Sequence, residues 1–388
     1  MRIVAIAEKA VPVASSMRNA AFDFSEMTTS VVAVTTDVVR NGKPVVGYAF
    51  NSTGRYACGA AMRARFIPRI LSAAPDELCD EAGLIDPARV LGRMMLREKP
   101  GGDAERSVPI GTIETAVWDA LAKVLDRPLW HVLAERFNGG RHPAAVPCYV
   151  GGGWYKPDED LAALCDEVKR HLGAGYTHIK IKVGGAPIKD DLARIEAAIG
   201  LMAGADHLAV DANAAFSPSR ARDYARALAP IGLRWFEEPC PPLDYGTFAE
   251  LTQTSAAPLA TGATLFCLAD VENLFSFGGL RRDRDILQVD PPQAYGIGAY
   301  ARMVAKVEEL GGTRQRIFPH GGNMMSFALV AGLGLGGCEA YPGVFAAFGG
   351  FADGMDVDKG MIALPNYPGI GFEAQPELYK IMREVSDV

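Results

Sequence analysis

Eight short apolar runs follow residue 146, and each is long enough for one β-strand. These strand candidates are residues 147–153, 178–183, 207–213, 233–239, 258–263, 285–292, 316–322 and 338–342. Stretches with helical spacing of apolar residues, such as 159–172 and 219–231, lie between them. Strands that alternate with helices favour a parallel sheet. Eight such units predict a closed parallel α/β barrel.

Most of these runs end in an ionisable side chain. The six residues are Lys182, Asp211, Glu237, Asp290, His320 and Glu339. Their spacings are 29, 26, 53, 30 and 19 residues, and the doubled interval skips the fifth run, which carries no such residue. In parallel barrels the active site gathers at the carboxyl ends of the strands. We therefore expect these six groups to converge at one mouth.

The remaining chain divides around this barrel. Residues 1–140 predict an α+β module, with strands at 2–13, 28–39 and 43–50 and helices at about 58–74 and 110–125. Asn41-Gly42 lies between the last two strands and is a strong hairpin signal. We expect the barrel to span 141–354 and the segment 355–388 to fold back onto the first module.

Asp211 and Glu237 indicate a metal site. They end neighbouring strands, so their carboxylates approach and repel one another unless a cation or a proton lies between them. Isolated oxygen ligands suit Mg²⁺, which keeps water and substrate oxygens in its coordination shell. Asn213 and Glu238 stand nearby as auxiliary ligands, whereas a surface acidic pair is the alternative for Glu237 and Glu238.

Lys180 and Lys182 lie two residues apart on one strand and therefore point to the same face. Ile179 and Ile181 occupy the other face, which meets the outer helices, so the lysines face the interior. Two ammonium groups in a confined space predict that one loses its proton and acts as a base.

His320 follows an apolar run, and Asp290 ends the preceding strand. An aspartate on one strand end can hold the imidazole of the next, fix its tautomer and raise its basicity. We therefore expect His320 and Asp290 to form an acid–base pair. A histidine without such a partner would more often be a structural residue.

Composition excludes several classes of function. Lys and Arg total 39 against 46 Asp and Glu, a net charge of −7, which argues against binding to nucleic acid or an anionic membrane. The seven cysteines contain no CxxC pair, and the first residues lack the apolar segment of a secretory signal. We expect a reduced, cytoplasmic protein that forms a homo-oligomer.

A lysine base, a histidine–aspartate pair and Mg²⁺ together indicate abstraction of a proton next to a carboxylate. The metal would stabilise the resulting enediolate. We expect Mg²⁺-dependent dehydration of a small hydroxy or sugar acid to a 2-keto acid. The alternative reaction is racemisation or epimerisation of a 2-hydroxy acid.

These motifs resemble the enolase superfamily, in its mandelate racemase-like branch, over nearly the whole chain. The matching elements are Lys180-x-Lys182, Asp211 in VDAN, Glu237 in FEEP, Asp290 with His320, and Glu339 in CEAYP. Segments 18–30, 105–123 and 318–327 are most similar to D-tartrate dehydratases. The resemblance implies a TIM-like (β/α)₇β barrel under an α+β capping domain.

The resemblance also implies roles for individual residues. Lys182 would take the proton and His320 would protonate the departing hydroxyl, with Asp290, Lys180 and Glu339 as further catalytic residues. Capping-loop residues would contact the small carboxylate substrate, and these are Asn19, Phe22, Asn51 and Tyr56.

The chain departs from the family at the fifth strand. The resemblance implies a third metal-ligand glutamate there, but Gly262 is followed by Ala263 and Thr264. Residues 251–269 contain no Asp or Glu. We therefore expect weakened Mg²⁺ binding, and the further alternative is a catalytically impaired homologue that only binds a ligand.

Overall fold

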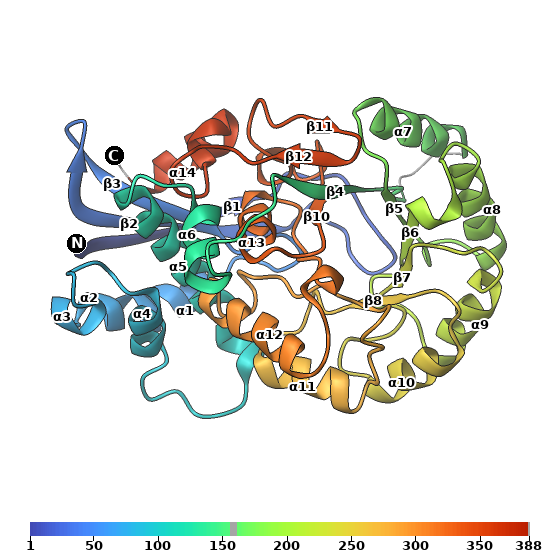
Figure 1. The fold of residues 1–388 in the computed structure, drawn as a ribbon, viewed down its shortest axis with the longest axis horizontal. Helices are drawn as coiled ribbons and strands as arrows, with labels where there is room; N and C mark the ends of the chain where they lie inside the picture. Colours follow the sequence, from blue (N-terminus) through green and yellow to red (C-terminus); the bar gives the residue numbers. More distant parts are fainter. Residues whose placement is uncertain (156–160, 387–388) are drawn as a thin grey trace.

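The structure is a computed structural model that describes residues 1–155 and 161–386. A three-stranded and a nine-stranded sheet organise these described residues (Figure 1). The helix predicted over 159–172 is observed as α7, and its first two predicted residues lie outside the described part. No described helix is long and apolar enough to cross a membrane.

The N-terminal sheet is antiparallel in the order β1-β2-β3. Its strands are β1 (Ile3–Pro12), β2 (Thr28–Arg40) and β3 (Lys43–Phe50). Asn41 and Gly42 connect β2 to β3 with φ angles of 50° and 77°. A two-residue hairpin needs such left-handed angles at both positions, so the hairpin prediction is confirmed.

Helices of the N-terminal half follow this sheet. They are α1 (Gly59–Ala61), the π-helical η1 (Met62–Phe66), α2 (Ile67–Leu71), α3 (Pro75–Leu78), α4 (Pro87–Met94), α5 (Asp103–Val124) and α6 (Leu129–Phe137). The apolar stripe predicted for 110–125 belongs to the longer α5, which is buried around its whole circumference from Arg106 to Lys123. Its polar residues therefore face other parts of the protein rather than solvent. The sequence predicts burial of one face of this helix only, and the observed burial is greater.

One polar contact of α5 runs to the second half of the chain. Glu114 accepts hydrogen bonds from the backbone N–H groups of Ile297 and Gly298, at 2.7 and 2.9 Å. On the other side of α5, a methyl group at Gly47 of β3 would overlap the carbonyl oxygen of Ala116. The helix thus packs closely against the N-terminal sheet and also contacts the second sheet's helices.

The second sheet carries the strands predicted after residue 146. They are β4 (Ala145–Gly152), β5 (Ile179–Lys182), β6 (Leu208–Asp211), β7 (Trp235–Glu237), β8 (Leu259–Thr261), β9 (Ile286–Leu287) and β10 (Cys338–Ala340). Strands β4 to β9 pair in parallel in chain order, and β10 pairs in parallel with β4.

The prediction of a full strand over 316–322 is wrong. This segment forms only a single parallel bridge, between Leu287 and Ile317. Pro319 lacks the N–H group that a ladder requires, and Gly321 and Gly322 both have positive φ. The segment still runs beside β9, so His320 keeps its position near the sheet.

The second sheet is strongly curved. Tyr149 of β4 and Trp235 of β7 lie three strands apart along the sheet, yet their ring centroids are 5.1 Å apart. Phe318 contacts both rings, at 6.2 and 5.5 Å. With Ala209, Ala260 and Ile286 they form a small apolar cluster separate from the main core. The sheet therefore wraps around an interior of its own.

Helices surround this curved sheet on its outer side, as Figure 1 shows for α7 to α12. Their bounds are α7 (Leu161–Gly173), α8 (Ile188–Ile199), α9 (Pro218–Leu228), α10 (Tyr245–Thr254), α11 (Leu268–Ser276), α12 (Ile297–Glu309) and α13 (Met324–Leu333). Short 3₁₀ turns are η2 (Ala205–His207), η3 (Arg314–Arg316), η4 (Ala346–Phe348) and η5 (Phe372–Ala374).

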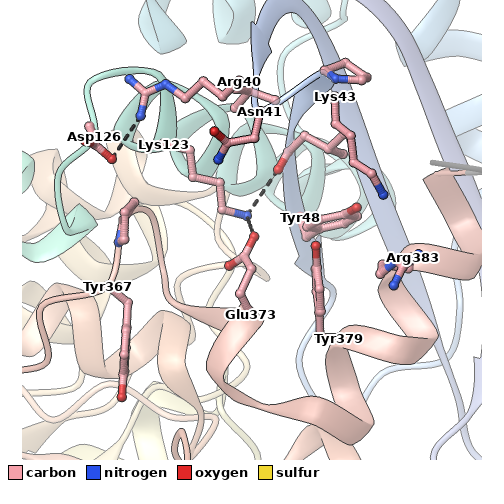
Figure 2. A pocket seen from close by; sticks show the side chains of 14 residues that line it. Arg40, Asn41, Lys43, Tyr48, Lys123, Asp126, Tyr367, Glu373, Tyr379 and Arg383 are labelled. Atoms are coloured by element: carbon pink, nitrogen blue, oxygen red, sulfur yellow. Dashed lines mark hydrogen bonds and ion pairs between the residues drawn. The ribbon is translucent and has the colours of Figure 1, made fainter.

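The C-terminal segment contacts both halves of the molecule. It contains β11 (Val357–Asp358), β12 (Met361–Ala363) and α14 (Pro376–Ser386), and β12 pairs antiparallel with β4. Figure 1 shows α14 beside the N-terminal sheet, and the ring of Tyr379 lies 6.0 Å from that of Tyr48 on β3. Glu373 forms a 2.6 Å ion pair with Lys123 of α5 (Figure 2).

Lys123→Met should destabilise the fold strongly. Lys123 also pairs with Asp119 at 2.6 Å, and the Asp119 side chain is fully buried, so its charge would lose its only cationic partner among the described residues. We expect a loss of about 3 kcal/mol or more in unfolding free energy, measured by urea denaturation. Glu373→Gln is the control, because Glu373 is 41% exposed, and it should cost less than about 1 kcal/mol. Equal effects would contradict this account.

Candidate active site

A buried cluster of ionisable side chains lies at the carboxyl ends of the parallel strands. It contains all six predicted strand-end residues together with Lys180 and Glu238. Lys180 and Lys182 are 1% and 2% exposed, and both face the interior, as the alternation with Ile179 and Ile181 predicts. Curvature of the sheet brings these side chains together from strands far apart in the sequence.

The two lysines form the centre of this cluster. Lys180 Nζ lies 2.5 Å from Glu237 Oε1, 2.6 Å from Glu339 Oε1 and 3.6 Å from Asp211 Oδ2. Lys182 Nζ lies 2.5 Å from Asp211 Oδ2. The cation that the repelling carboxylates require is therefore, in this structure, a lysine ammonium group.

The sequence predicts that one of the two lysines loses its proton, and Lys180 is not that lysine in this structure. Burial alone lowers its pKa, but the charges of Glu237 and Glu339 outweigh burial and hold the pKa well above its ordinary value. Lys180 is therefore a permanent cation that holds three strand ends together.

The remaining oxygens of the two predicted metal ligands are already hydrogen-bonded. Glu237 Oε2 accepts from Trp235 Nε1 at 2.9 Å and from Gln288 Nε2 at 2.8 Å. Asp211 Oδ1 accepts from the backbone N–H of Asn213 at 2.8 Å. Gln288 was not predicted, although it lies two residues before Asp290 in the same run and so shares its face.

His320 and Asp290 form the second part of the site, and their predicted contact is present. His320 Nδ1 lies 2.8 Å from Asp290 Oδ2, and the Ser52 hydroxyl donates to the same oxygen at 2.7 Å. Burial lowers the pKa of His320, but the Asp290 hydrogen bond and the charges of Glu339 and Asp290 raise it to about 9. The imidazole is therefore protonated at neutral pH.

A small cavity of about 50 Å³ exposes both Lys182 and His320. Its other walls come from Asn19, Phe22, Phe24, Thr53, Gly54, Arg55, Trp154, Asn213, Glu238, Ala263, Thr264, Gln293, Tyr341 and Phe345. At roughly 10–15 Å³ for each water, it has room for only a few water molecules. The predicted base and the predicted acid therefore face one enclosed space, as acid–base chemistry on a single small molecule requires.

Two of the four predicted substrate contacts are placed elsewhere. Asn51 is fully buried, its Oδ1 accepts from Thr29 and Ser30, and its Nδ2 donates to the carbonyls of Arg55 and Tyr56. Its amide has no free group for a ligand, because it holds the loop 51–56 in shape. Tyr56 is 58% exposed and lies outside the cavity wall, whereas Asn19 and Phe22 line it.

Three buried oxygens on the wall of this cavity have no hydrogen-bond partner in the described residues. They are Asn213 Oδ1, Glu238 Oε1 and Thr264 Oγ1, and all three residues line the cavity. Burial, followed by the charges of Asp211 and Glu237, raises the pKa of Glu238 to about 7. Unpaired oxygens beside excess negative charge are the chemistry that a hard divalent cation satisfies.

Backbone strain places two of these oxygens. Asn213 and Glu238 have φ angles of 48° and 43°, which is uncommon for residues with side chains. Strand alternation would turn Glu238 away from Glu237, and the left-handed conformation instead leaves both carboxylates in the interior. Such strain is concentrated at functional positions. No three carboxylate, imidazole or thiol groups of the described residues are arranged to hold a metal by themselves.

A second and larger cavity, of about 750 Å³, lies between β3 and the C-terminal segment (Figure 2). It contains none of the predicted site residues. Two of its cations are already paired, Arg40 with Asp126 and Lys123 with Glu373. This cavity is larger than the one that holds Lys182 and His320, but the predicted chemistry belongs to the smaller cavity.

The His320–Asp290 pair should be visible by NMR in the metal-free protein. We expect the His320 ring to titrate near pH 9, and Asp290→Asn should lower this pKa because the bond and the charge are both lost. The pKa of His320 in the folded protein exceeds the roughly 6.5 of an unfolded histidine, so protonation of His320 stabilises the folded state. This contribution to the unfolding free energy is complete below about pH 6.5 and is lost as the pH rises through about 9.

Asp126→Asn is the control for this titration, because Asp126 is 67% exposed and pairs with Arg40 in the other cavity. It should leave the titration of His320 unchanged. An ordinary histidine pKa in the unmodified protein would refute the assigned pair.

Comparisons with known proteins show which family the chain belongs to. Residues 163–378 match the family described as enolase C-terminal domain-like. The chain is 30% identical to the 3,6-anhydro-alpha-L-galactonate cycloisomerase of Streptomyces coelicolor over 70% of each chain. It is 24% identical to the arabinonate dehydratase of Saccharolobus solfataricus, over 70% of this chain and 71% of that one.

A further relative is the L-talarate/galactarate dehydratase of Salmonella typhimurium, 29% identical over 54% of this chain and 50% of that protein. The fold matches a racemase from Streptomyces coelicolor A3(2) with bound magnesium, with a TM-score of 0.77, 23% identity and coverage of 97% and 99%. The family match spans more than half of the chain, and the chain therefore belongs to the enolase superfamily, among its mandelate racemase and muconate lactonizing enzyme-like members.

Proposed function

We propose that the protein dehydrates a small, tartrate-like hydroxy acid to a 2-keto acid with the help of Mg²⁺. The observation that carries this proposal is that Lys182 and His320 face one small cavity, each held by its own carboxylate. Relatives that are sugar acid dehydratases support the reaction class.

In the proposed reaction Lys182 Nζ acts as a neutral amine, after passing its own proton to solvent, and takes the proton from the carbon next to the substrate carboxylate. The electron pair left behind expels the hydroxyl group of the neighbouring carbon. His320, protonated at neutral pH, gives its proton to that hydroxyl, which leaves as water. Asp290 orients the imidazole, and the enol product rearranges to the 2-keto acid.

Lys180 and Glu339 support this chemistry without reaching the cavity wall. Glu339 accepts from Lys180 and from the Tyr341 hydroxyl at 2.5 Å, and it also lies 3.3 Å from the backbone nitrogen of Gly321. Gly321 follows His320 directly. Glu339 thereby connects the lysine side of the site to the histidine side, and we assign both residues as positioning groups.

We further propose that Asp211 and Glu237 hold Mg²⁺, with Asn213 and Glu238 as auxiliary ligands. The unpaired oxygens of Asn213 and Glu238 and the raised pKa of Glu238 support a cation here. When bound, Mg²⁺ supplies positive charge against the enediolate oxygens. Solved structures of similar fold contain magnesium, including an L-talarate/galactarate dehydratase liganded with Mg and L-glucarate, of TM-score 0.76 and 20% identity.

Ala263 stands where the family resemblance implies a third ligand glutamate. It follows β8 and lines the cavity, so a longer side chain at this position would point toward the site. We propose that its small side chain weakens Mg²⁺ binding. A catalytically impaired protein that only binds its ligand is the second candidate, and Ala263 is the specific observation in its favour.

The proposed architecture is a (β/α)₇β barrel, 141–354, under a capping domain formed by 1–140 and 355–388. The pairing of β10 with β4 and the curvature that joins Tyr149 to Trp235 support closure. The backbone N–H of Gly336 also donates to the carbonyl of Ile317 at 3.0 Å, across the place of the missing strand. All seven cysteines are free, which suits the proposed cytoplasmic homo-oligomer.

Lys182→Ala and His320→Asn should each lower tartrate turnover by about 10² to 10⁴, the usual contribution of a general acid or base. Release of the 2-keto acid in the presence of Mg²⁺ provides the measurement. Unchanged turnover in either variant would show that the assignment is wrong. Asp126→Asn, distant from the site, should retain full activity.

Product analysis in deuterated water separates the two reactions. A dehydratase should give a keto acid that has lost water. A racemase would instead return the hydroxy acid with deuterium at an inverted carbon, with Lys182 and His320 acting as opposed bases. Inversion without loss of water would replace the dehydratase proposal with the racemase.

Ala263→Glu should raise Mg²⁺ affinity by about tenfold or more, because affinity for hard cations follows the number of charged oxygen ligands. Calorimetric titration with Mg²⁺ provides the measurement. Ala263→Gln is the matched control, since it adds nearly the same volume without the charge, and it should gain much less. Equal affinities in all three proteins would refute the role given to position 263.

A further inference from the structure

Arg55 is a cation of the cavity that the proposed reaction does not use. It lies on the loop 51–56, and its guanidinium carbon stands 5.0 Å from the centroid of the Phe266 ring. The loop is held against the acid side of the site, because Ser52 donates to Asp290 at 2.7 Å and Gln293 donates to the Thr53 carbonyl at 3.2 Å. Hydrogen bonds therefore hold the backbone just before Arg55 beside Asp290, the partner of His320.

Arg55 has no ionic partner in the described residues, unlike the other cations of this cavity. Lys182 pairs with Asp211 and His320 with Asp290, whereas the Nε atom of Arg55 is buried without a hydrogen-bond partner. Burial lowers the pKa of Arg55, and the charges of Glu238 and Asp290 only partly oppose this. An arginine nevertheless remains charged in proteins.

Glu238 lines the same cavity and also has an oxygen without a partner, yet it forms no ion pair with Arg55 in this structure. The cavity thus separates an unpaired anion from an unpaired cation. Buried charges are costly unless they are paired. A bound ligand that presents negative charge to Arg55 would remove that cost.

We propose that Arg55 binds the second carboxylate of the substrate, so that the site takes dicarboxylic hydroxy acids in preference to monocarboxylic ones. This inference rests on the proposed function and names its substrate class. The first carboxylate lies next to the carbon that Lys182 deprotonates. The distal end of a short diacid then reaches Arg55, whose planar fork matches a carboxylate with two parallel hydrogen bonds.

Family membership leaves this choice open. Among the relatives are an arabinonate dehydratase, named for an acid with one carboxylate, and an L-talarate/galactarate dehydratase, named for acids with two. Discrimination between acids with one and with two carboxylates must therefore come from residues other than the catalytic ones. Arg55 is such a residue, because it touches neither Lys182 nor His320 in the described interactions and belongs to a different part of the chain.

The test compares tartrate with threonate of the same configuration, which differs only in carrying an alcohol in place of the second carboxylate. Binding is measured by calorimetry with Mg²⁺ present, in the His320→Asn background, so that turnover does not disturb the equilibrium. We expect tartrate to bind at least about tenfold tighter, the usual value of a charge-assisted hydrogen bond. Arg55→Gln should remove this preference by weakening tartrate alone, and Arg55→Lys should retain part of it.

Arg383→Gln is the matched control, because it removes an exposed cation of the larger cavity in Figure 2 and should change neither affinity. Thermal unfolding and circular dichroism establish that each variant is folded. The proposal is overturned if Arg55→Gln weakens both acids equally, if it weakens neither, or if neither acid binds. Diacid selectivity without turnover in the unmodified protein would contradict only the proposed reaction.

Discussion

Charge compensation around Lys180 is the interaction on which the centre of the molecule depends. Its ammonium group contacts carboxylates from β6, β7 and β10, so a single cation ties together strands that are distant in the sequence. Buried carboxylates repel one another strongly unless a cation lies between them. Removal of this lysine would leave several buried anions without compensation, and the curved sheet would lose the contacts that join its strand ends.

The same requirement links the two halves of the molecule. Asp290 compensates His320 from within the second sheet, and Ser52 of the N-terminal half donates to the same carboxylate oxygen. On the far side of α5, Glu114 accepts from the first turn of α12. The loop that encloses the cavity is thus attached to the acid–base pair itself, and closure of the site depends on the same bonds that orient the catalytic groups.

Much of the site could be predicted because strand alternation is local. Two lysines separated by one residue on a strand must share a face. A polar residue at the carboxyl end of a buried parallel strand lies at the mouth where active sites form. The same reasoning failed where the backbone leaves the strand. Pro319 and the glycines after His320 interrupt the seventh strand, and the left-handed conformation of Glu238 turns it into the interior.

The sequence by itself determined the order of strands and helices, the inward face of the lysines and the partnership of Asp290 with His320, because each follows from periodicity along a short segment. Only the tertiary structure decided which charges remain unpaired. The Asn51 amide bonds within the N-terminal half, Gln288 and Ser52 donate to Glu237 and Asp290, and Arg55 and Glu238 are left facing the cavity. Ser52 and Asp290 are 238 positions apart and Gln288 and Glu237 are 51 apart, so their pairing depends on how distant segments pack and not on any local pattern.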